Sequence, residues 1–192
     1  SLNPHADHQG CFVLYGCHAR DMVAVAGARD DRRCVLANAD PQYDTPLSFD
    51  LDAERDRDPA AWARGWSDYL EAPTVKAEVA RHVGPRSRPL NYVKAAVLRL
   101  ADAGDTGCGL NLALAGDIPA AAGQSSSSAL VVVTALALQA AGWPRHTRHE
   151  LAALLAEAEW YVGTRGGSGD HAAMLLGERG ELTNVRFEPP VG

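Results

Sequence analysis

One continuous segment, residues 109–141, predicts a strand, a loop and a helix in that order. Leucines at every second position, separated by smaller or polar residues, are typical of a half-buried strand. These leucines are Leu110, Leu112 and Leu114. The strand is expected to end at Gly116, and residues 117–128 are rich in Gly, Ala, Pro and Ser. An apolar run then continues to Ala141, where a following glycine and proline are typical of a helix end.

A loop of small residues between a strand and a helix is suited to binding an anion. The first turn of a helix leaves N–H groups without intrahelical partners, and the helix dipole adds partial positive charge there. The four hydroxyls of residues 125–128 add hydrogen-bond donors and an oxygen ligand suited to Mg²⁺. The alternative is a flexible serine-rich linker. The loop is not a Walker A sequence, because it lacks the GxxxxGK[ST] pattern.

Residues 163–170 contain a second glycine-rich loop that ends in an acid, Asp170. Three glycines within four residues allow positive φ angles and the close approach of a ligand. Asp170 stands at the start of an apolar helical run, where it could be a helix N-cap and nothing more. Its carboxylate could also accept a hydroxyl proton, as phosphoryl transfer requires. A phosphate-binding loop elsewhere in the chain favours the second interpretation.

Polar residues are concentrated near the N-terminal end, just before an apolar run. His5, Asp7 and Gln9 alternate, so in an extended chain they would point to one side. Such a row can form hydrogen bonds with several sugar hydroxyls. The alternative is a zinc site on the His-x-Asp-His pattern, although no cysteine or further histidine lies at a suitable spacing.

The remaining sequence mixes helical and strand patterns. Further strands are expected over residues 11–15, 22–28, 34–37 and 182–187. The second and third of these runs read as a hairpin, and residues 41–59 as a loop or edge region. Helices are expected over residues 59–70, 74–82, 91–103 and 147–161. Because the spacing is not that of regular βαβ units, the expected fold class is α+β, with helices packed on a mixed or antiparallel sheet.

The composition limits the kinds of protein to which the chain can belong. The 192 residues are enough for one large or two small domains, and no linker or repeat divides them. No apolar run of about 18 residues is present, which argues against a membrane span. The net charge of −6 argues against a nucleic-acid partner. The four cysteines form no CxxC pair and no signal peptide is visible, so we expect free thiols and a cytoplasmic location.

Three motifs resemble those of the GHMP kinases, and most closely those of the galactokinase-like sugar kinases. Residues 119–129, PAAAGQSSSSA, resemble the phosphate-binding motif PxxxGLxSSxA, with Gln124 in place of leucine. Residues 5–14, HADHQGCFVL, are similar to the end of the sugar-kinase motif EHxDYxGGxVL, with Pro4 in place of its glutamate. Residues 167–171, GSGDH, resemble the motif GxxDQ, with histidine in place of glutamine.

The resemblance implies a fold and a function. The fold would be the ribosomal protein S5 domain 2-like, ATP-binding N-terminal domain of these kinases, over residues 1–192, with the start of the first motif and a C-terminal domain missing. The function would be ATP-dependent phosphorylation of a monosaccharide hydroxyl, with the anomeric hydroxyl of galactose expected. Arabinose, a uronic acid or a heptose phosphate stay open, because Pro4 and His8 alter the sugar motif. The alternative is a catalytically incomplete domain that binds nucleotide or sugar without transferring phosphate.

The resemblance also implies roles for individual residues. Asp170 would be the catalytic base, and Ser127 and Glu159 would hold Mg²⁺. The residues expected to bind ATP are Pro119, Gly123, Gln124, Ser125, Ser126, Ser127 and Ser128. The residues expected to contact the sugar are His5, Asp7, Gly167 and Gly169. The expected partners are therefore ATP, Mg²⁺ and a small sugar, with no nucleic acid and no membrane.

Overall fold

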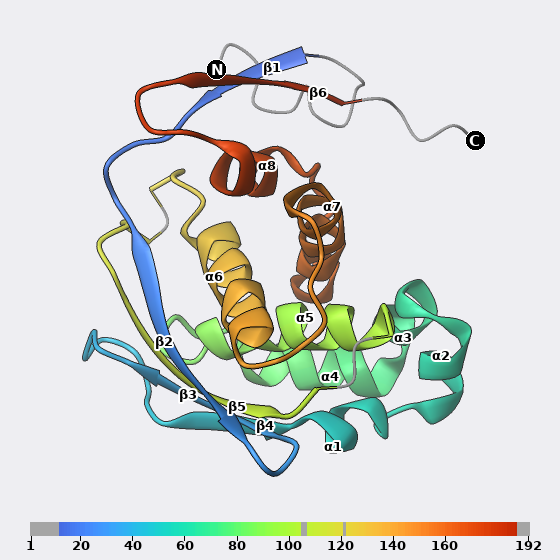
Figure 1. Cartoon of the computed structure of the whole chain (residues 1–192). Helices are drawn as coiled ribbons and strands as arrows, with labels where there is room; N and C mark the ends of the chain where they lie inside the picture. Colours follow the sequence, from blue (N-terminus) through green and yellow to red (C-terminus); the bar gives the residue numbers. More distant parts are fainter. Residues whose placement is uncertain (1–11, 105–106, 121, 188–192) are drawn as a thin grey trace.

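The computed structural model describes residues 12–104, 107–120 and 122–187 and has an α+β fold (Figure 1). The strands are β1 (Phe12–Gly16), β2 (Met22–Arg29), β3 (Arg33–Asn38), β4 (Leu47–Asp50), β5 (Gly109–Gly116) and β6 (Leu182–Arg186). The helices are α1 (Leu51–Arg55), α2 (Pro59–Arg64), α3 (Trp66–Glu71), α4 (Pro73–Arg81), α5 (Pro89–Asp102), α6 (Ser126–Ala140), α7 (Arg148–Ala158), the 3₁₀ helix η2 (Glu159–Val162) and α8 (Gly169–Leu176). This arrangement confirms the expected fold class. None of the helices in the described part of the chain is long and apolar enough to cross a bilayer.

Four strands form the main sheet, in the order β2-β5-β3-β4. Strand β5 pairs antiparallel with β2 and parallel with β3, and β3 pairs antiparallel with β4. The alternating leucines of β5 are at most 3% exposed, and α5 and α6 lie on the sheet face that they occupy (Figure 1). A second, two-stranded sheet joins β1 and β6 beside α8.

The expected hairpin between residues 22–28 and 34–37 is wrong. Strand β5 lies between β2 and β3 and pairs with both, although these two strands follow one another in the sequence. The backbone N–H of Gly109 donates to the carbonyl oxygen of Asp31, and a side chain at Gly109 would clash with the backbone of Arg33. Strand β5, with its leucines buried, therefore has a partner strand on both sides, whereas β2, with Val25 75% exposed, lies at the sheet edge.

Two further expectations concern residues 41–71. Residues 41–59, expected to be a loop or edge region, contain the edge strand β4, so the edge interpretation is confirmed. They are not all loop, because α1 follows β4, capped by the side chain of Asp50. The helix expected over residues 59–70 is divided into α2 and α3 at Gly65, whose φ of 110° interrupts the helix. The aromatic residues of this segment still share one face, because the rings of Trp62 and Tyr69 meet edge to face at 4.9 Å.

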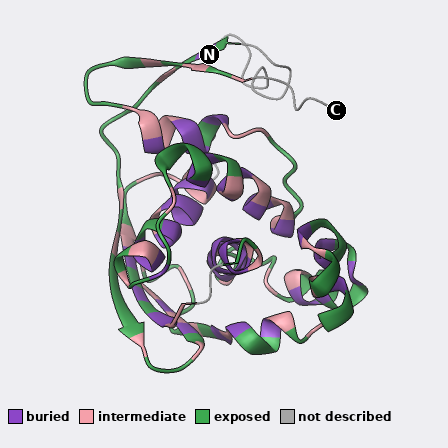
Figure 2. Cartoon of the chain, turned by 45° about the vertical axis from the view of Figure 1, so that its right-hand side comes forward, coloured by how far each residue is buried: buried purple, intermediate pink, exposed green. Residues whose placement is uncertain are grey.

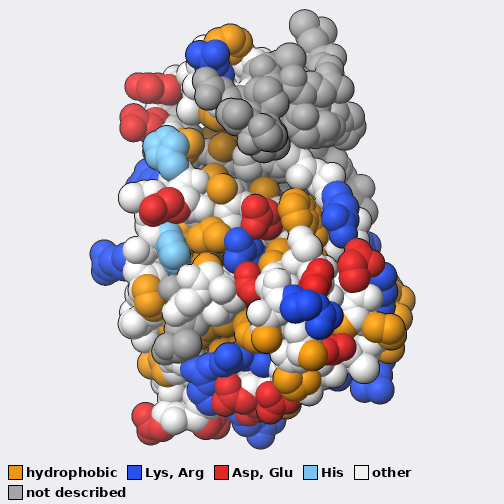
Figure 3. Space-filling view, turned by 90° about the vertical axis from the view of Figure 1, so that its right-hand side faces the viewer, with side chains coloured by type: hydrophobic (Ala, Val, Ile, Leu, Met, Phe, Trp, Pro, Cys, Tyr) orange, Lys and Arg blue, Asp and Glu red, His pale blue; other side chains and the backbone are white. Residues whose placement is uncertain are grey.

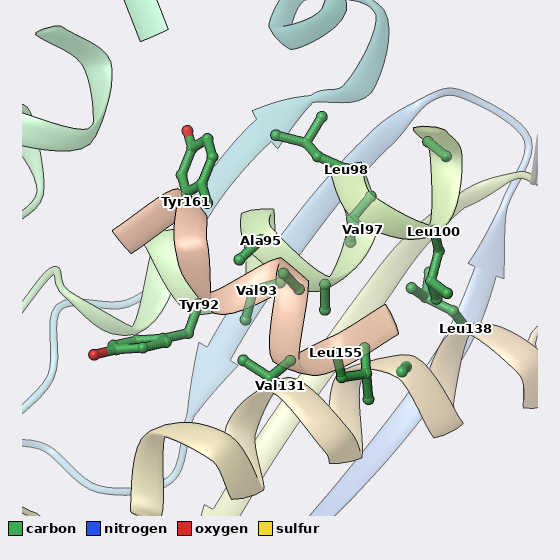
Figure 4. Close-up of a cluster of buried hydrophobic side chains, with 14 of the residues drawn as sticks. Tyr92, Val93, Ala95, Val97, Leu98, Leu100, Val131, Leu138, Leu155 and Tyr161 are labelled. Atoms are coloured by element: carbon green, nitrogen blue, oxygen red, sulfur yellow. The ribbon is translucent and has the colours of Figure 1, made fainter. Parts of the chain in front are cut away.

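The hydrophobic core lies where α5, α6 and α7 meet. Figure 4 shows side chains from these helices in one cluster, including Val93, Val131, Leu138 and Leu155. Buried residues line the inward sides of the helices, and exposed residues occupy their outer sides (Figure 2). Helix α6 ends as its sequence predicts, since the amides of Gly142 and Trp143 donate back to carbonyl oxygens of its last turn.

A network of buried charges crosses this core. The Nζ of Lys94, a residue that is 1% exposed, lies 2.7 Å from Glu54 and 2.6 Å from Glu78. Arg57 also pairs with both carboxylates, at 2.6 Å and 3.1 Å. The network therefore ties α5 to α1 and α4. By contrast, on the face shown in Figure 3, acidic and basic side chains are intermixed at the surface.

Stability is expected to fall in acid as Glu78 takes up a proton. Burial by itself raises the pKa of Glu78, but the hydrogen bond from Lys94 and the neighbouring positive charges outweigh it, so the pKa lies below the ordinary 4.5. The stabilisation is therefore complete above pH 4.5 and is lost as the pH falls through the lower folded pKa. Urea unfolding between pH 6 and 3 measures it. Glu78→Gln should show a shallower dependence of unfolding free energy on pH, and equal slopes would contradict the prediction.

Candidate functional site

The N-terminal ends of α6 and α8 meet at one end of the helical layer (Figure 1). Ser125, which immediately precedes α6, donates a hydrogen bond from Oγ to Oδ2 of Asp170 at 2.6 Å. These residues are 45 positions apart in the sequence. The structure therefore brings together the serine-rich loop and the second glycine-rich loop.

The backbone before α6 has an uncommon conformation. Ser125 has φ 54° and ψ 40°, and among the residues that the structure describes no other non-glycine residue has a positive φ. Gly123 is also left-handed, with φ 69°. The side chain of Ser125 does not cap the helix, so its hydroxyl is free to bond to Asp170. Strained conformations of this kind cost free energy and cluster at functional sites.

Asp170 lies in the first turn of α8, and its side chain is exposed. The interpretation of Asp170 as an N-cap is wrong, because the helix begins at Gly169 and Ser168 occupies the N-cap position. A carboxylate in the first turn interacts favourably with the helix dipole. Asp170 is therefore accessible to a ligand and fixed in direction by Ser125.

A cavity of about 840 Å³ opens beside the start of α6. The loop contributes Pro119, Ser126 and Ser127 to its wall. This volume lies within the range of small-molecule sites, about 300–1,000 Å³. The cavity thus joins a helix N-terminus, which attracts anions, to a space large enough for an organic ligand.

Basic and aromatic side chains also line the cavity, together with the acids Asp40 and Asp117. Tyr43, Arg88 and Tyr92 line it, and the guanidinium of Arg88 lies 5.7 Å from the centre of the Tyr92 ring. Arg20 also lines the cavity and donates to the carbonyl oxygen of Asp117 at 2.8 Å. This combination suits a ligand that has both a planar ring and negative charge.

Glu159 and His171 lie together in the protein interior. Glu159 is 7% exposed at the start of η2, and His171 is 2% exposed in α8, next to Asp170. Oε1 of Glu159 lies 3.3 Å from Nε2 of His171. Glu159, one of the two residues expected to hold Mg²⁺, is therefore a buried side chain that contacts the residue next to Asp170.

The other predicted site residues differ in their surroundings. Gly123 and Gln124 are exposed, whereas Ser128 is 3% exposed and belongs to the buried side of α6. Gly169 is buried and Gly167 is half-buried. His5 and Asp7 lie outside the described residues.

The basic and aromatic residues of the cavity lining could not be recognised from the sequence. Tyr43, Arg88 and Tyr92 come from two separate segments, and neither periodicity nor a motif marks them as ligand-binding. Only the basic, proline-flanked stretch of residues 85–89, PRSRP, is an unusual local signal.

Known proteins resemble this chain in sequence. Residues 91–178 match the family described as "GHMP kinases N terminal domain". The galactokinase of Dictyostelium discoideum is 28% identical over 190 residues, and that of Saccharomyces cerevisiae is 30% identical over 196 residues. Each match covers 98% of this chain and 34% of the relative. The chain therefore spans about a third of the length of these curated relatives.

Solved structures share the fold. The structure of Lactococcus lactis galactokinase complexed with galactose matches with a TM-score of 0.69 and 24% identity, over 98% of this chain and 44% of that chain. A mevalonate kinase matches with a TM-score of 0.65 and 13% identity, over 96% of this chain and 50% of that chain. At these identities the likeness shows the fold alone.

Proposed function

We propose that the chain is the ATP-binding part of a sugar kinase of the GHMP type, because residues 91–178 match the family described as "GHMP kinases N terminal domain". The observation that carries the proposal is the 2.6 Å contact between Ser125 and Asp170, in which Ser125 directly precedes Ser126 and Ser127 of the cavity lining. The galactokinase relatives support a monosaccharide acceptor, with galactose or a related sugar and its anomeric hydroxyl as our first choice. Because the chain spans a third of these relatives, nucleotide binding is proposed for the chain and phosphoryl transfer for the full-length protein.

In this proposal the serine-rich loop and the cavity bind ATP. The phosphates would lie against the N-terminal amides of α6, where the hydroxyls of Ser126 and Ser127 add donors. The adenine ring of ATP would occupy the cavity, where the rings of Tyr43 and Tyr92 offer stacking surfaces. Gly123 and Gln124, which are exposed, would place the backbone of the loop alongside the phosphates of ATP.

Asp170 would act as the base toward the sugar. Its exposed carboxylate can accept the proton of a sugar hydroxyl, which raises the nucleophilicity of the oxygen that attacks the γ-phosphate. The hydrogen bond from Ser125 would hold that carboxylate beside the phosphates. His5 and Asp7, with Gly167 and Gly169, are proposed to bind the sugar itself, and a C-terminal domain would complete the site.

The residues present also fit Mg²⁺. Hydroxyl and carboxylate oxygens are the ligands that this cation prefers, and Ser127 and Glu159 would supply them. Oε1 of Glu159 is buried and makes no aligned hydrogen bond in the described structure, although Nε2 of His171 lies 3.3 Å away, so the protein does not fully satisfy this carboxylate. When bound, Mg²⁺ would offset negative charge on the phosphates. We also propose a cytoplasmic location, in keeping with the proposed use of ATP and with the free thiols of Cys17, Cys34 and Cys108 in the described structure.

Thermal unfolding of the chain with and without Mg-ATP tests the nucleotide site. At about 100 times its dissociation constant, a ligand stabilises a protein by about 2.7 kcal/mol, which for a chain of this size raises the midpoint by roughly 5–11 °C. Ser127→Val should reduce this shift, because it removes a hydroxyl from the cavity wall. Ser67→Val, an exposed change on α3, is the matched control. If millimolar Mg-ATP leaves the wild-type midpoint unchanged, the proposed function is wrong.

A further inference from the structure

The pair of buried side chains behind Asp170, Glu159 and His171, is not explained by packing alone. Nε2 of His171 lies 3.3 Å from Oε1 of Glu159. Within the described structure, however, both imidazole nitrogens of His171 and this carboxylate oxygen lack a hydrogen-bond partner. Leaving a buried polar atom without a partner costs about 1–3 kcal/mol. The neighbouring positions of α8 that face the same interior are apolar, namely Ala172 and Leu175. An apolar residue in place of His171 would therefore cost the fold less.

The backbone around Glu159 is held without the help of this pair. The amide of Thr164 donates to the carbonyl oxygen of Glu159 at 3.2 Å, and η2 continues directly from α7. These backbone contacts do not fix the orientation of the Glu159 carboxylate. His171 is the group that faces it, and a rotation of either side chain would align the 3.3 Å contact as a hydrogen bond from Nε2 to Oε1.

We propose that His171 is a positioning residue that orients the Glu159 carboxylate for the divalent cation. This inference rests on the proposed function, and it adds a role for the residue at which the chain departs from the GxxDQ motif. Carboxylates that bind metals are generally held by a second hydrogen bond, and the loss of such a partner typically lowers metal affinity about 10–100-fold. Because His171 follows Asp170 in the same turn of α8, its contact with Glu159 also connects the proposed cation ligand to Asp170, the proposed catalytic base.

Two amide substitutions separate positioning from packing. In His171→Gln the side-chain NH₂ reaches about as far as Nε2 and can donate to Glu159, whereas in His171→Asn the shorter amide reaches only as far as Nδ1. Both variants place an uncharged amide in the same interior, so they are matched in chemistry. Binding of Mn²⁺ to the chain at saturating ADP is followed by water proton relaxation, which responds to protein-bound Mn²⁺. ADP affinity without metal and the thermal midpoint are measured in parallel.

We expect His171→Asn to weaken Mn²⁺ binding about 10–100-fold and His171→Gln to retain it within a few-fold. ADP affinity without metal should be the same in all three proteins. Equal Mn²⁺ affinity in wild type and His171→Asn would overturn the role of His171 and leave the proposed function standing. Equal losses in both variants would overturn it too, since they would show a packing role. Absence of ADP-dependent Mn²⁺ binding in the wild type would instead overturn the proposed function and this inference together.

Discussion

Replacement of Asp170 by asparagine is expected to lower the kcat of sugar phosphorylation about 10²–10⁴-fold, the range found for the loss of a general base. The carbonyl oxygen of asparagine can still accept the hydrogen bond that Ser125 now donates to Oδ2, so the loop geometry should persist. The amide cannot take up the proton of a sugar hydroxyl. The substitution therefore removes the chemical step and spares the binding of ATP.

The measurement needs a full-length protein that contains this chain, assayed with ATP and a panel of sugars. Asp68→Asn is the control, because Asp68 is an exposed acid on α3 whose carboxylate pairs only with the nearby Arg64 in the described structure. Nucleotide affinity should stay within about twofold of wild type in both variants. Unchanged turnover in Asp170→Asn would remove Asp170 from the mechanism. A joint loss of turnover and nucleotide binding would show that Asp170 supports the loop rather than the reaction.

The local elements of the site could be predicted because their signals are local. The alternation that ends at Leu114, the small residues after Gly116 and the helix stop at Gly142 each depend on neighbours a few positions away. The same holds for the capping box of α7, in which Thr147 and Glu150 bond to each other's backbone amides as their spacing predicts. The anion-binding character of the serine-rich loop can be predicted in the same way, because it depends on the residue types within one loop.

The pairing of distant segments could not be predicted with the same information. The runs that form β2 and β3 are neighbouring apolar runs with a short polar segment between them, as in a hairpin, yet β5 separates them, because burial of its leucines outweighs sequence proximity. The contact between Ser125 and Asp170 has the same origin, since it depends on how α6 and α8 pack. The wall formed by Tyr43 and Tyr92 is likewise a product of the tertiary fold, so no local pattern marks it.

The two lysines of the chain provide a second large and well-controlled prediction, this time for stability. Lys94→Met should lower the free energy of unfolding by about 3–5 kcal/mol, because it removes the buried cation that Glu54 and Glu78 share and leaves only the partly exposed Arg57 paired with both carboxylates. For a chain of this size, that corresponds to a drop of roughly 6–20 °C in the thermal midpoint. Lys76→Met makes the same chemical change at a side chain that is 58% exposed, where an ion pair with Glu71 contributes less than about 1 kcal/mol.

A triple variant shows whether uncompensated charge is the cause. If Lys94→Met destabilises the chain because two carboxylates remain buried, adding Glu54→Gln and Glu78→Gln should restore part of the lost stability. Removal of a complete buried network costs less than removal of one partner. Arg57 does not prevent this recovery, because its side chain is 26% exposed and can turn toward water. If the triple variant is instead less stable than Lys94→Met alone, the carboxylates stabilise α1 and α4 through contacts other than Lys94, and the charge argument is wrong.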